Sequence, residues 1–416
     1  MAVKLTVPKG WKKGTIGELV VGIRGVTFAS EDVLAAPNDS SVMLLRSNNI
    51  KDGRINFEEV YHLPPTYVSD AQTARMGDVA VCMSNGSKRL VGKAARISKN
   101  DAERKIAVGA FCALFRPTTN ADPHFVPYLF DTESYRRELH ITLSGSAINN
   151  LKNSDIEGIK IPLPPLAEQR KIAEILRTWD EAIETAEAEL KAKQERKRGL
   201  VQIFINVSVE GVEALMKKGR PKVLLSKLGT LKKGGAILRE KLRPQGAAVI
   251  LYGDIYTKYA EIVTRFVSRV DSSAVVDGVR LNYGDIVFAG SGETAEEIGK
   301  CIAYVGNEEA YAGGDVIILS NHGQDARYLG YALNAEDAIR QKMRLGQGSS
   351  VMHLYKDDVG SIQIPLPPLA EQRKIAEVLQ SEDEAIDALK TKAELLRAQK
   401  RGLMQKLLTG EVRVAA

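Results

Sequence analysis

The sequence predicts an α+β protein with two globular domains and two long helical segments, all related by an internal duplication. Its 416 residues are too many for one ordinary hydrophobic core, so at least two domains are expected. The string IPLPPLAEQRKIAE occurs at 161–174 and again at 364–377, an offset of 203 residues (364 − 161). Identical stretches this far apart indicate a duplicated unit rather than a short-period repeat.

The duplication extends beyond this string. At the same offset, residues 180–183 match 383–386, and KRGL occurs at both 197–200 and 400–403. Toward the beginning of each copy the similarity weakens and the offset drifts to 207, as between Gly77 and Gly284. Each copy therefore has a divergent front of about 150 residues and a nearly identical back. We infer that the backs share one task and that the fronts perform different ones.

Each back segment has the heptad pattern of a coiled coil. Apolar residues recur at alternating steps of three and four and are flanked by charged residues, which is typical of a helix–helix seam. A helix of about 40 residues is roughly 60 Å long. Two independent amphipathic helices, each packed on its own domain, are the alternative. The predicted seam residues are Ile172, Leu176, Trp179, Ile183, Leu190, Ile375, Leu379, Ile386, Leu389 and Leu396.

The front segments are predicted to mix helices and short strands. β-type runs such as 79–83 and 286–288 are separated by Gly, Asn, Asp and Ser, and they do not alternate regularly with helices. A Rossmann sheet is therefore not expected. The predicted globular domains are 1–155 and 211–358, and the predicted helical spacers are 156–210 and 359–416.

Composition argues against several classes of protein. The sequence has no run of about 18 apolar residues, so no membrane-spanning helix is expected. Cys82, Cys112 and Cys301 are scattered, which is typical of reduced thiols in the cytoplasm rather than of a zinc site. The beginning of the sequence lacks the apolar core of an export signal, so a cytoplasmic location is expected. The histidines show no metal-ligand spacing, and no metal is expected.

Basic clusters point to DNA as a partner. Residues 88–105 hold seven Lys or Arg against two acids, and residues 217–243 hold ten against Glu240 alone. Clustered cations suit a phosphate backbone, and polar loop side chains can read base edges. For each residue the alternative is an ordinary solvated surface. The candidate DNA contacts are Arg24, Arg46, Asn48, Asn49, Ser84, Asn85, Lys88, Arg89, Lys93, Lys232, Lys233, Arg239, Lys241, Arg243, Tyr252, Lys258 and Ser291.

One motif suggests an enzyme, but its context argues against that. Residues 288–292 read FAGSG, the glycine turn with which many methyltransferases hold S-adenosylmethionine. An amino-methyltransferase also needs an [N/D/S]PP[Y/F/W] motif, which the sequence lacks, and the counterpart at 81–85 reads VCMSN. The phosphate-binding pattern GxxxxGK[ST] also fails at both Gly-Lys pairs. We therefore expect a strand and a turn at 288–292, no catalytic residue and no bound cofactor.

The repeated PLPPLAEQ, followed each time by a heptad helix and KRGL, resembles the conserved region of type I restriction–modification specificity subunits, the HsdS family. Trp11 with Leu19, the Gly-Ser segments before each conserved region and the closing LLTG at 407–410 agree with this resemblance. It covers essentially the whole chain. One departure is the end of the first helix, where 204–207 reads FINV.

The resemblance implies two target-recognition domains, each reading one half of a split DNA site. It also implies that the two conserved helices pack antiparallel as a spacer. Methylase subunits, expected in two copies, would carry S-adenosylmethionine, and restriction subunits would use ATP and Mg²⁺. The chain itself would be a non-catalytic subunit.

The repeated PLPPLAEQRK segment is a candidate for binding such a partner, since a duplicated surface suits two copies of one subunit. The alternative is that this segment only begins each helix and docks it on its own domain. Two other functions remain open: a coiled-coil adaptor without sequence readout, and a self-contained methyltransferase using the FAGSG turn. The candidate partner-binding residues are Glu168, Gln169, Arg170, Glu371, Gln372 and Arg373.

Overall fold

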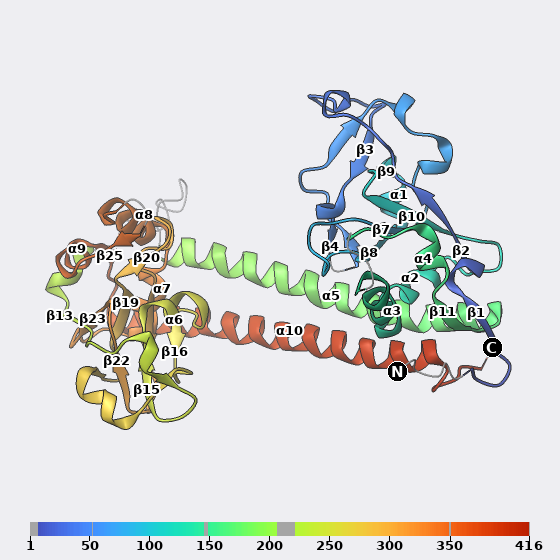
Figure 1. The fold of residues 1–416 in the computed structure, drawn as a ribbon. Helices are drawn as coiled ribbons and strands as arrows, with labels where there is room; N and C mark the ends of the chain where they lie inside the picture. Colours follow the sequence, from blue (N-terminus) through green and yellow to red (C-terminus); the bar gives the residue numbers. More distant parts are fainter. Residues whose placement is uncertain (1–6, 52, 145–148, 206–220, 349–350, 416) are drawn as a thin grey trace. The chain divides into compact units, whose positions relative to one another are not determined.

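The structure, a computed structural model, describes residues 7–51, 53–144, 149–205, 221–348 and 351–415. The chain divides into two compact units: unit 1 consists of 1–186 and 392–416, and unit 2 of 187–391. The division falls within both long helices, α5 (Leu166–Phe204) and α10 (Leu369–Thr409). Each unit therefore contains one globular domain and one half of each long helix (Figure 1). The predicted boundary between 210 and 211 lies outside the described residues.

Unit 1 is built on small antiparallel and mixed sheets. The main sheet has the order β2-β10-β7-β8, a second has the order β6-β3-β9, and two pairs join β1 to β11 and β4 to β5. The strands are β1 (Lys12–Thr15), β2 (Val20–Arg24), β3 (Val42–Leu45), β4 (Ile50–Lys51), β5 (Arg54–Ile55), β6 (Tyr61–Leu63), β7 (Val79–Cys82), β8 (Ala94–Arg96), β9 (Ile106–Val108), β10 (Cys112–Pro117) and β11 (Lys160–Leu163). The short helices are α1 (Lys99–Ala102), α2 (Val126–Leu129), α3 (Glu133–Ser144) and α4 (Asn153–Glu157).

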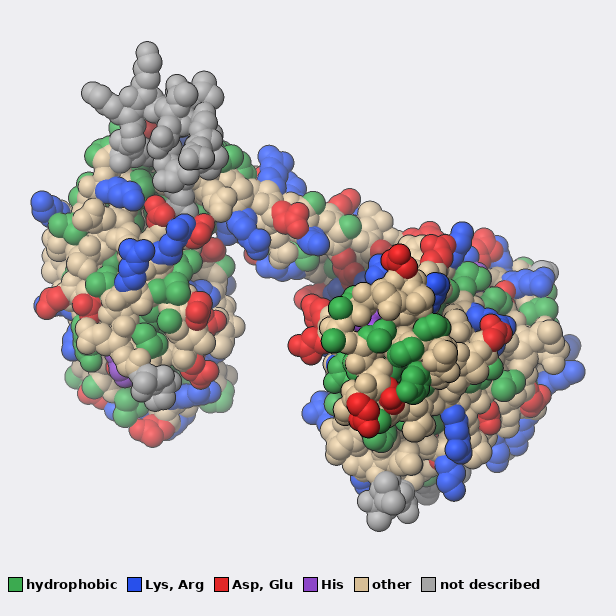
Figure 2. Space-filling view, turned by 90° about the horizontal axis from the view of Figure 1, so that it is seen from above, with side chains coloured by type: hydrophobic (Ala, Val, Ile, Leu, Met, Phe, Trp, Pro, Cys, Tyr) green, Lys and Arg blue, Asp and Glu red, His purple; other side chains and the backbone are tan. Residues whose placement is uncertain are grey.

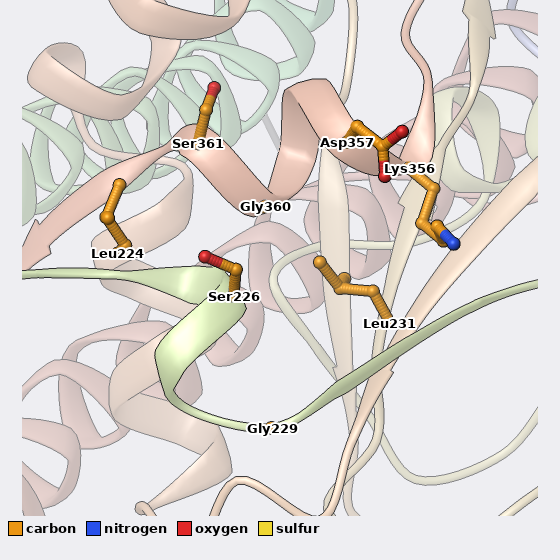
Figure 3. A pocket seen from close by; sticks show the side chains of 8 residues that line it. All are labelled: Leu224, Ser226, Gly229, Leu231, Lys356, Asp357, Gly360 and Ser361. Carbon is orange, nitrogen blue, oxygen red and sulfur yellow. The ribbon is translucent and has the colours of Figure 1, made fainter.

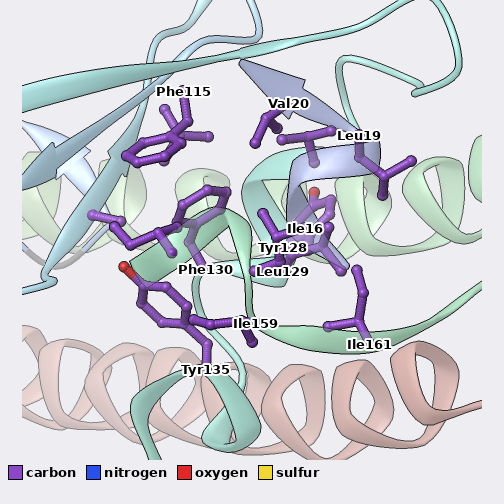
Figure 4. Close-up of a cluster of buried hydrophobic side chains, with 14 of the residues drawn as sticks. Ile16, Leu19, Val20, Phe115, Tyr128, Leu129, Phe130, Tyr135, Ile159 and Ile161 are labelled. Atoms are coloured by element: carbon purple, nitrogen blue, oxygen red, sulfur yellow. The ribbon is translucent and has the colours of Figure 1, made fainter. Parts of the chain in front are cut away.

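The core of unit 1 joins the main sheet to both long helices. Phe115 of β10, Phe130 and Tyr135 pack in succession as tilted ring pairs, with ring centroids 5.6 and 5.2 Å apart (Figure 4). The same buried cluster includes Leu176 of α5 and Leu407 of α10. The helix halves are therefore part of the domain core, and burying these apolar surfaces stabilises both together.

Unit 2 is also built on antiparallel and mixed sheets, but its two main sheets have five strands each. One has the order β13-β23-β19-β21-β16, the other β14-β17-β15-β22-β18, and two pairs join β12 to β25 and β20 to β24. The strands are β12 (Lys222–Leu224), β13 (Thr230–Lys233), β14 (Leu242–Arg243), β15 (Ala247–Ile250), β16 (Ile262–Val263), β17 (Arg269–Val270), β18 (Val279–Leu281), β19 (Ile286–Ala289), β20 (Ser291–Gly292), β21 (Cys301–Tyr304), β22 (Ala310–Ala312), β23 (Val316–Ser320), β24 (Met352–His353) and β25 (Gln363–Pro365). Its short helices are α6 (Tyr252–Thr257), α7 (Ala326–Leu333), α8 (Glu336–Leu345) and α9 (Lys356–Ser361).

Within each unit the helix halves run antiparallel. In unit 1, Asp180 and Glu168 of α5 contact Lys400 of α10 and Arg413 beyond it, so one residue number rises as the other falls. In unit 2 the buried cluster joins Ile205, which follows α5, to Ile375 near the start of α10. The predicted α+β fold with two antiparallel helices is thereby confirmed. Of the predicted seam, the buried residues are Ile172, Leu176, Ile183, Ile375, Leu379 and Ile386, and the half-buried ones are Trp179, Leu190, Leu389 and Leu396.

Unit 1 joins its domain to both helices through one partly buried carboxylate, Asp180 of α5. The Tyr128 hydroxyl from α2 donates to Asp180 Oδ2 at 2.7 Å, and Lys400 Nζ from α10 contacts Oδ1 at 2.6 Å. Arg96 of β8 adds a further contact to Oδ2 at 3.0 Å. Burial raises the pKa of Asp180, but Lys400, Tyr128 and Arg96 outweigh it and lower the pKa overall. The carboxylate is therefore held in its charged form.

Unit 2 makes the same contact with the equivalent residues. The Tyr331 hydroxyl donates to Asp383 Oδ2 at 2.6 Å, and Lys197 Nζ contacts Oδ1 at 2.6 Å. All three residues lie 203 positions from their counterparts in unit 1. We call each set a Tyr–Asp–Lys contact. Its lysine always comes from the long helix of the other repeat, so each domain is anchored by both halves of the sequence.

Removing one cation from this contact should destabilise unit 1. Lys400→Met leaves the Asp180 carboxylate largely buried without its main partner, so we expect a loss of about 2–4 kcal/mol in unfolding free energy. The measurement is denaturant unfolding of the full chain. Lys390→Met, at an exposed pair on the same helix, serves as a control and should change stability by less than about 1 kcal/mol. Equal losses for the two variants would contradict the anchoring role.

Candidate nucleic-acid interface

Three loops of unit 1 meet beyond the end of β7. Asn85 Nδ2 donates to Ser47 Oγ at 3.3 Å, and Asn149 Nδ2 donates to the Gly86 carbonyl at 3.0 Å. A β-bridge pairs Ser84 with Asn150. We call this group the unit 1 loop cluster. Its members are Ser47, Asn48, Ser84, Asn85, Ser87, Lys88, Arg89, Asn149 and Asn150.

The unit 1 loop cluster offers amides, hydroxyls and two cations at the surface. Asn48, Lys88, Arg89 and Asn150 are exposed, and amide side chains can make the paired donor and acceptor contacts that read an adenine edge. Sequence analysis identified residues from two of these loops and missed the Asn-Asn pair at 149–150. This pair follows directly on the duplicated Gly-Ser segment, which was the available signal.

Two candidates from these loops have structural roles instead. Asn49 is 1% exposed, and its side chain accepts from the Arg46 backbone N–H at 2.9 Å and donates to two carbonyls. The Arg46 guanidinium lies 3.6 Å above the Tyr61 ring and donates to the Glu59 carbonyl. The Asn49 side chain is not available to a ligand in this arrangement, so we correct the prediction that it contacts DNA. Arg46 is half-buried, and its contact with DNA stays a prediction.

Equivalent loops also meet in unit 2, with different side chains. Asp254 accepts from the Leu251 N–H much as Asn49 accepts from Arg46. Ser291 Oγ lies 3.0 Å from His353 Nδ1, and β20 pairs with β24 here. We call Tyr252, Ser291 and His353 the unit 2 loop cluster. His353 stands at the position of Asn150, 203 residues later, and sequence analysis did not single it out.

The charge differs between the two clusters. Where unit 1 carries Lys88 and Arg89, the corresponding loop of unit 2 carries Glu293, Glu296 and Glu297, all exposed. Ser291, a predicted DNA contact, is only 3% exposed and is engaged by the His353 ring. The equivalent loops therefore have similar backbone positions but carry side chains of opposite charge.

The remaining basic candidates do not form one patch. Lys232 and Lys233 lie on β13, which β23 separates from β19. In Figure 2, Lys and Arg side chains are interspersed with Asp and Glu on both units. Two of the candidates are already paired with acids: Lys241 with Asp277 and Lys258 with Asp254, each at 2.7 Å. The others differ in exposure. The exposed ones are Arg24, Arg239 and Arg243, and Lys93 is half-buried. Lys217, Lys218 and Arg220 lie outside the described residues.

A buried donor fixes the end of each cluster's central loop. Gly92 and Gly299 adopt positive φ angles of 76° and 70°. In unit 1 the Tyr135 hydroxyl donates to the Gly92 carbonyl at 2.9 Å, and in unit 2 Lys342 Nζ donates to the Gly299 carbonyl at 2.8 Å. Lys342 is 1% exposed, and burial lowers its pKa. In unit 2 a lysine one helical turn further along thus makes the contact that a tyrosine makes in unit 1.

The FAGSG turn is filled by the protein itself. A Cβ atom on Gly290 would lie 3.0 Å from the Asp315 carbonyl, and one on Gly292 would lie 2.9 Å from the Tyr256 hydroxyl. Phe288 and Ala289 are fully buried. Close packing within unit 2 therefore accounts for both glycines.

The repeated PLPPLAEQRK segment docks each helix on its own unit. Gln169 accepts from the Asp122 N–H at 3.0 Å and donates to the Pro164 carbonyl at 3.0 Å. Gln372 repeats this with Asp325 and Pro367 at 3.1 and 2.8 Å. Both glutamines are buried, so we correct their predicted role as partner-binding residues.

Glu168 is also engaged inside its unit. It is 3% exposed, accepts from Trp11 Nε1 at 2.7 Å and forms a salt bridge with Arg413 at 2.7 Å. Hydrogen bonding from Arg413 is the main cause of its lowered pKa. Glu371 is half-buried. Only Arg170 and Arg373 of the six candidates are exposed.

Comparison with known protein families shows which family has this sequence. Residues 8–194 and 224–397 match the family described as the type I restriction modification DNA specificity domain. The two matches follow the two repeats. The chain belongs to this family. It is therefore a DNA-recognition subunit of the type I restriction–modification class, and that role is non-catalytic.

Individual relatives agree with the family. The StySPI specificity subunit of Salmonella potsdam is 25% identical over 381 residues, covering 89% of this chain and 81% of that protein. The EcoKI specificity subunit of Escherichia coli K12 is 30% identical over 205 residues, 49% of this chain and 44% of that protein. The S subunit structure from M. genitalium shares the fold, with a TM-score of 0.59 at 16% identity and 98% coverage of both chains. Within the described residues, no helix is long and apolar enough to cross a membrane.

Removing two cations from the unit 1 loop cluster should weaken the salt dependence of DNA binding. Each phosphate contact contributes about 0.9 to the slope of log K against log salt, so Lys88→Ala with Arg89→Ala should reduce that slope by about 2. Lys99→Ala lies in the same basic run but on α1, and it should leave the slope unchanged. The measurement is a salt titration of DNA binding. An unaltered slope in the double variant would contradict the assigned backbone contact.

Lys342 should make unit 2 less stable as pH falls. Its folded pKa is lowered, so its neutral form fits the fold best, and stability is lost as pH falls from the ordinary lysine value of 10.5 through the folded pKa. Lys342→Met removes the titrating group together with the donor to the Gly299 carbonyl, so the variant should lose less unfolding free energy than the wild-type chain as pH falls from 10.5 to 7. The measurement is denaturant unfolding at both pH values. An equal loss in the two chains would exclude titration of Lys342 as its cause.

Proposed function

We propose that this chain reads a split DNA site, one half with each unit. The observation that carries this proposal is the pair of loop clusters on duplicated frames. Both frames use the same Tyr–Asp–Lys contact and the same buried glutamine, yet the loops they carry differ. Identical anchoring with different loops suits two half-sites of unrelated sequence.

Within unit 1, the amides would read bases and the cations would neutralise phosphates. Asn48 is exposed and can offer a donor and an acceptor to a base edge, and Asn85 and Asn149 each retain a second amide N–H beyond the one that holds the cluster together. Lys88 and Arg89 border them and suit the backbone. In unit 2, Tyr252 and His353 would read bases, while the cations of β13 and β14 would contact the backbone. The glutamates of the unit 2 loop can accept from a cytosine amino group.

The other subunits would bind as the relatives' family name suggests. Two methylase subunits would carry S-adenosylmethionine and modify adenine, and restriction subunits would supply ATP- and Mg²⁺-dependent cleavage. Arg170 and Arg373, exposed at equivalent positions, support a partner that binds twice. The expected location is the cytoplasm. If both units enter the major groove from one face of the DNA, the half-site centres would be about 10–10.5 bp apart.

Substitutions in one cluster should relax only one half of the target. Replacing Asn48, Asn85 and Asn149 together with alanine should reduce discrimination at the affected base pairs, since each good base contact is worth about 1–3 kcal/mol. Tyr252→Ala with His353→Ala is the matched variant and should relax the other half. The measurement is binding to DNA libraries with each half-site randomised. Relaxation of both halves by either variant would contradict one reading domain per half-site.

A further inference from the structure

Unit 2 contains a surface pocket at a place where unit 1 is filled. The pocket has a volume of about 500 Å³ and lies between α9 and the segment leading into β13 (Figure 3). The 3₁₀ turn Leu225–Lys227 belongs to this segment. Its lining residues are Leu224, Ser226, Gly229, Leu231, Lys356, Asp357, Gly360 and Ser361.

The same place in unit 1 is occupied by a glutamate. The Gly22 N–H on edge strand β2 donates to Glu157 Oε1 of α4 at 2.8 Å. Gly22 and Gly17 leave room for this side chain and its neighbour: a Cβ on Gly22 would lie 2.6 Å from Asn153, and one on Gly17 would lie 3.0 Å from Glu157. A carboxylate thus fills the groove between helix and strand.

In unit 2 the small residue lies on the helix and the larger residues lie opposite it, so the carboxylate that fills unit 1 is missing. Gly360 stands at the position of Glu157, 203 residues later. The matching backbone bonds, Ile16 N to Ile159 O and Leu225 N to Ile362 O, place Ser226 and Leu231 opposite it, where unit 1 has glycines. A Cβ on Gly360 would lie 3.2 Å from the Leu231 side chain.

The acceptor for one backbone N–H is therefore also missing. Hydrogen-bonded and non-hydrogen-bonded pairs alternate along an antiparallel ladder. Gly234 N donates to Val316 O, so the alternation directs the Leu231 N–H away from β23 and toward α9. No acceptor for it occurs among the residues that the structure describes. Lys356 replaces the neutral Asn153 and brings a cation to the rim, beside the acidic Asp357.

We propose that this pocket binds an acidic side chain of another subunit of the restriction–modification complex. The carboxylate would accept from the Leu231 N–H, as Glu157 does from Gly22, and Lys356 would add a charge-assisted contact. This inference rests on the proposed function, because it assumes that such subunits bind. The equivalent place in unit 1 is filled by Glu157, so a subunit that inserts a carboxylate into this pocket can make that contact only with unit 2.

The test introduces the unit 1 arrangement into unit 2. In the full chain, Gly360→Glu with Leu231→Gly supplies an internal carboxylate. Binding of the methylase and restriction subunits encoded with this chain is then measured separately by calorimetry. We expect affinity for one of them to fall at least about tenfold, while DNA affinity and the melting temperature stay unchanged.

A second variant keeps the test decisive if the double variant folds poorly. Lys356→Glu changes only the rim and should weaken the same subunit about tenfold. Arg265→Glu, an exposed charge reversal elsewhere in unit 2, should not. Unchanged affinity for both subunits in the Lys356→Glu and the folded double variant would overturn the pocket assignment alone. Failure of the wild-type chain to bind either subunit would overturn this inference and the proposed partners together.

Discussion

The Tyr–Asp–Lys contact is the interaction on which the architecture depends. A partly buried carboxylate in each long helix is held in place there by a buried tyrosine and a lysine. The tyrosine belongs to the adjoining domain and the lysine to the helix of the other repeat. Each unit is thus completed by residues from both copies of the duplication, although the chain is continuous. The long helices accordingly belong to the domain cores.

This anchoring leaves the loops able to vary. The frame around Gln169 and Gln372 is the same in both units, down to the backbone groups that each amide contacts. The loops at the end of β7 and β19 share their position but differ in charge and side-chain type. A constant frame with variable loops is how recognition is commonly separated from stability. Because the frame provides the stability, the polar and charged side chains of the loops are free to differ between the two units.

The sequence predicted the frame better than the interface. Exact repetition and heptad spacing are local signals, and they correctly indicated the duplication, the helices and most of the seam. Which polar residues face a ligand depends on packing, which sequence does not reveal. Asn49 and Gln169 were selected as ligand contacts, but both are buried and hydrogen-bonded. Asn149 was missed because its neighbours in the cluster lie about 60 to 100 residues earlier in the chain.

The central claim is that two different loop clusters on one frame read two halves of one site. The most direct test is to co-express the chain with its methylase and to map modified adenines across a genome by single-molecule sequencing. The expected result is a motif of two short, unrelated half-sites separated by a constant gap. A single uninterrupted motif, or methylation by the chain without a methylase, would contradict it.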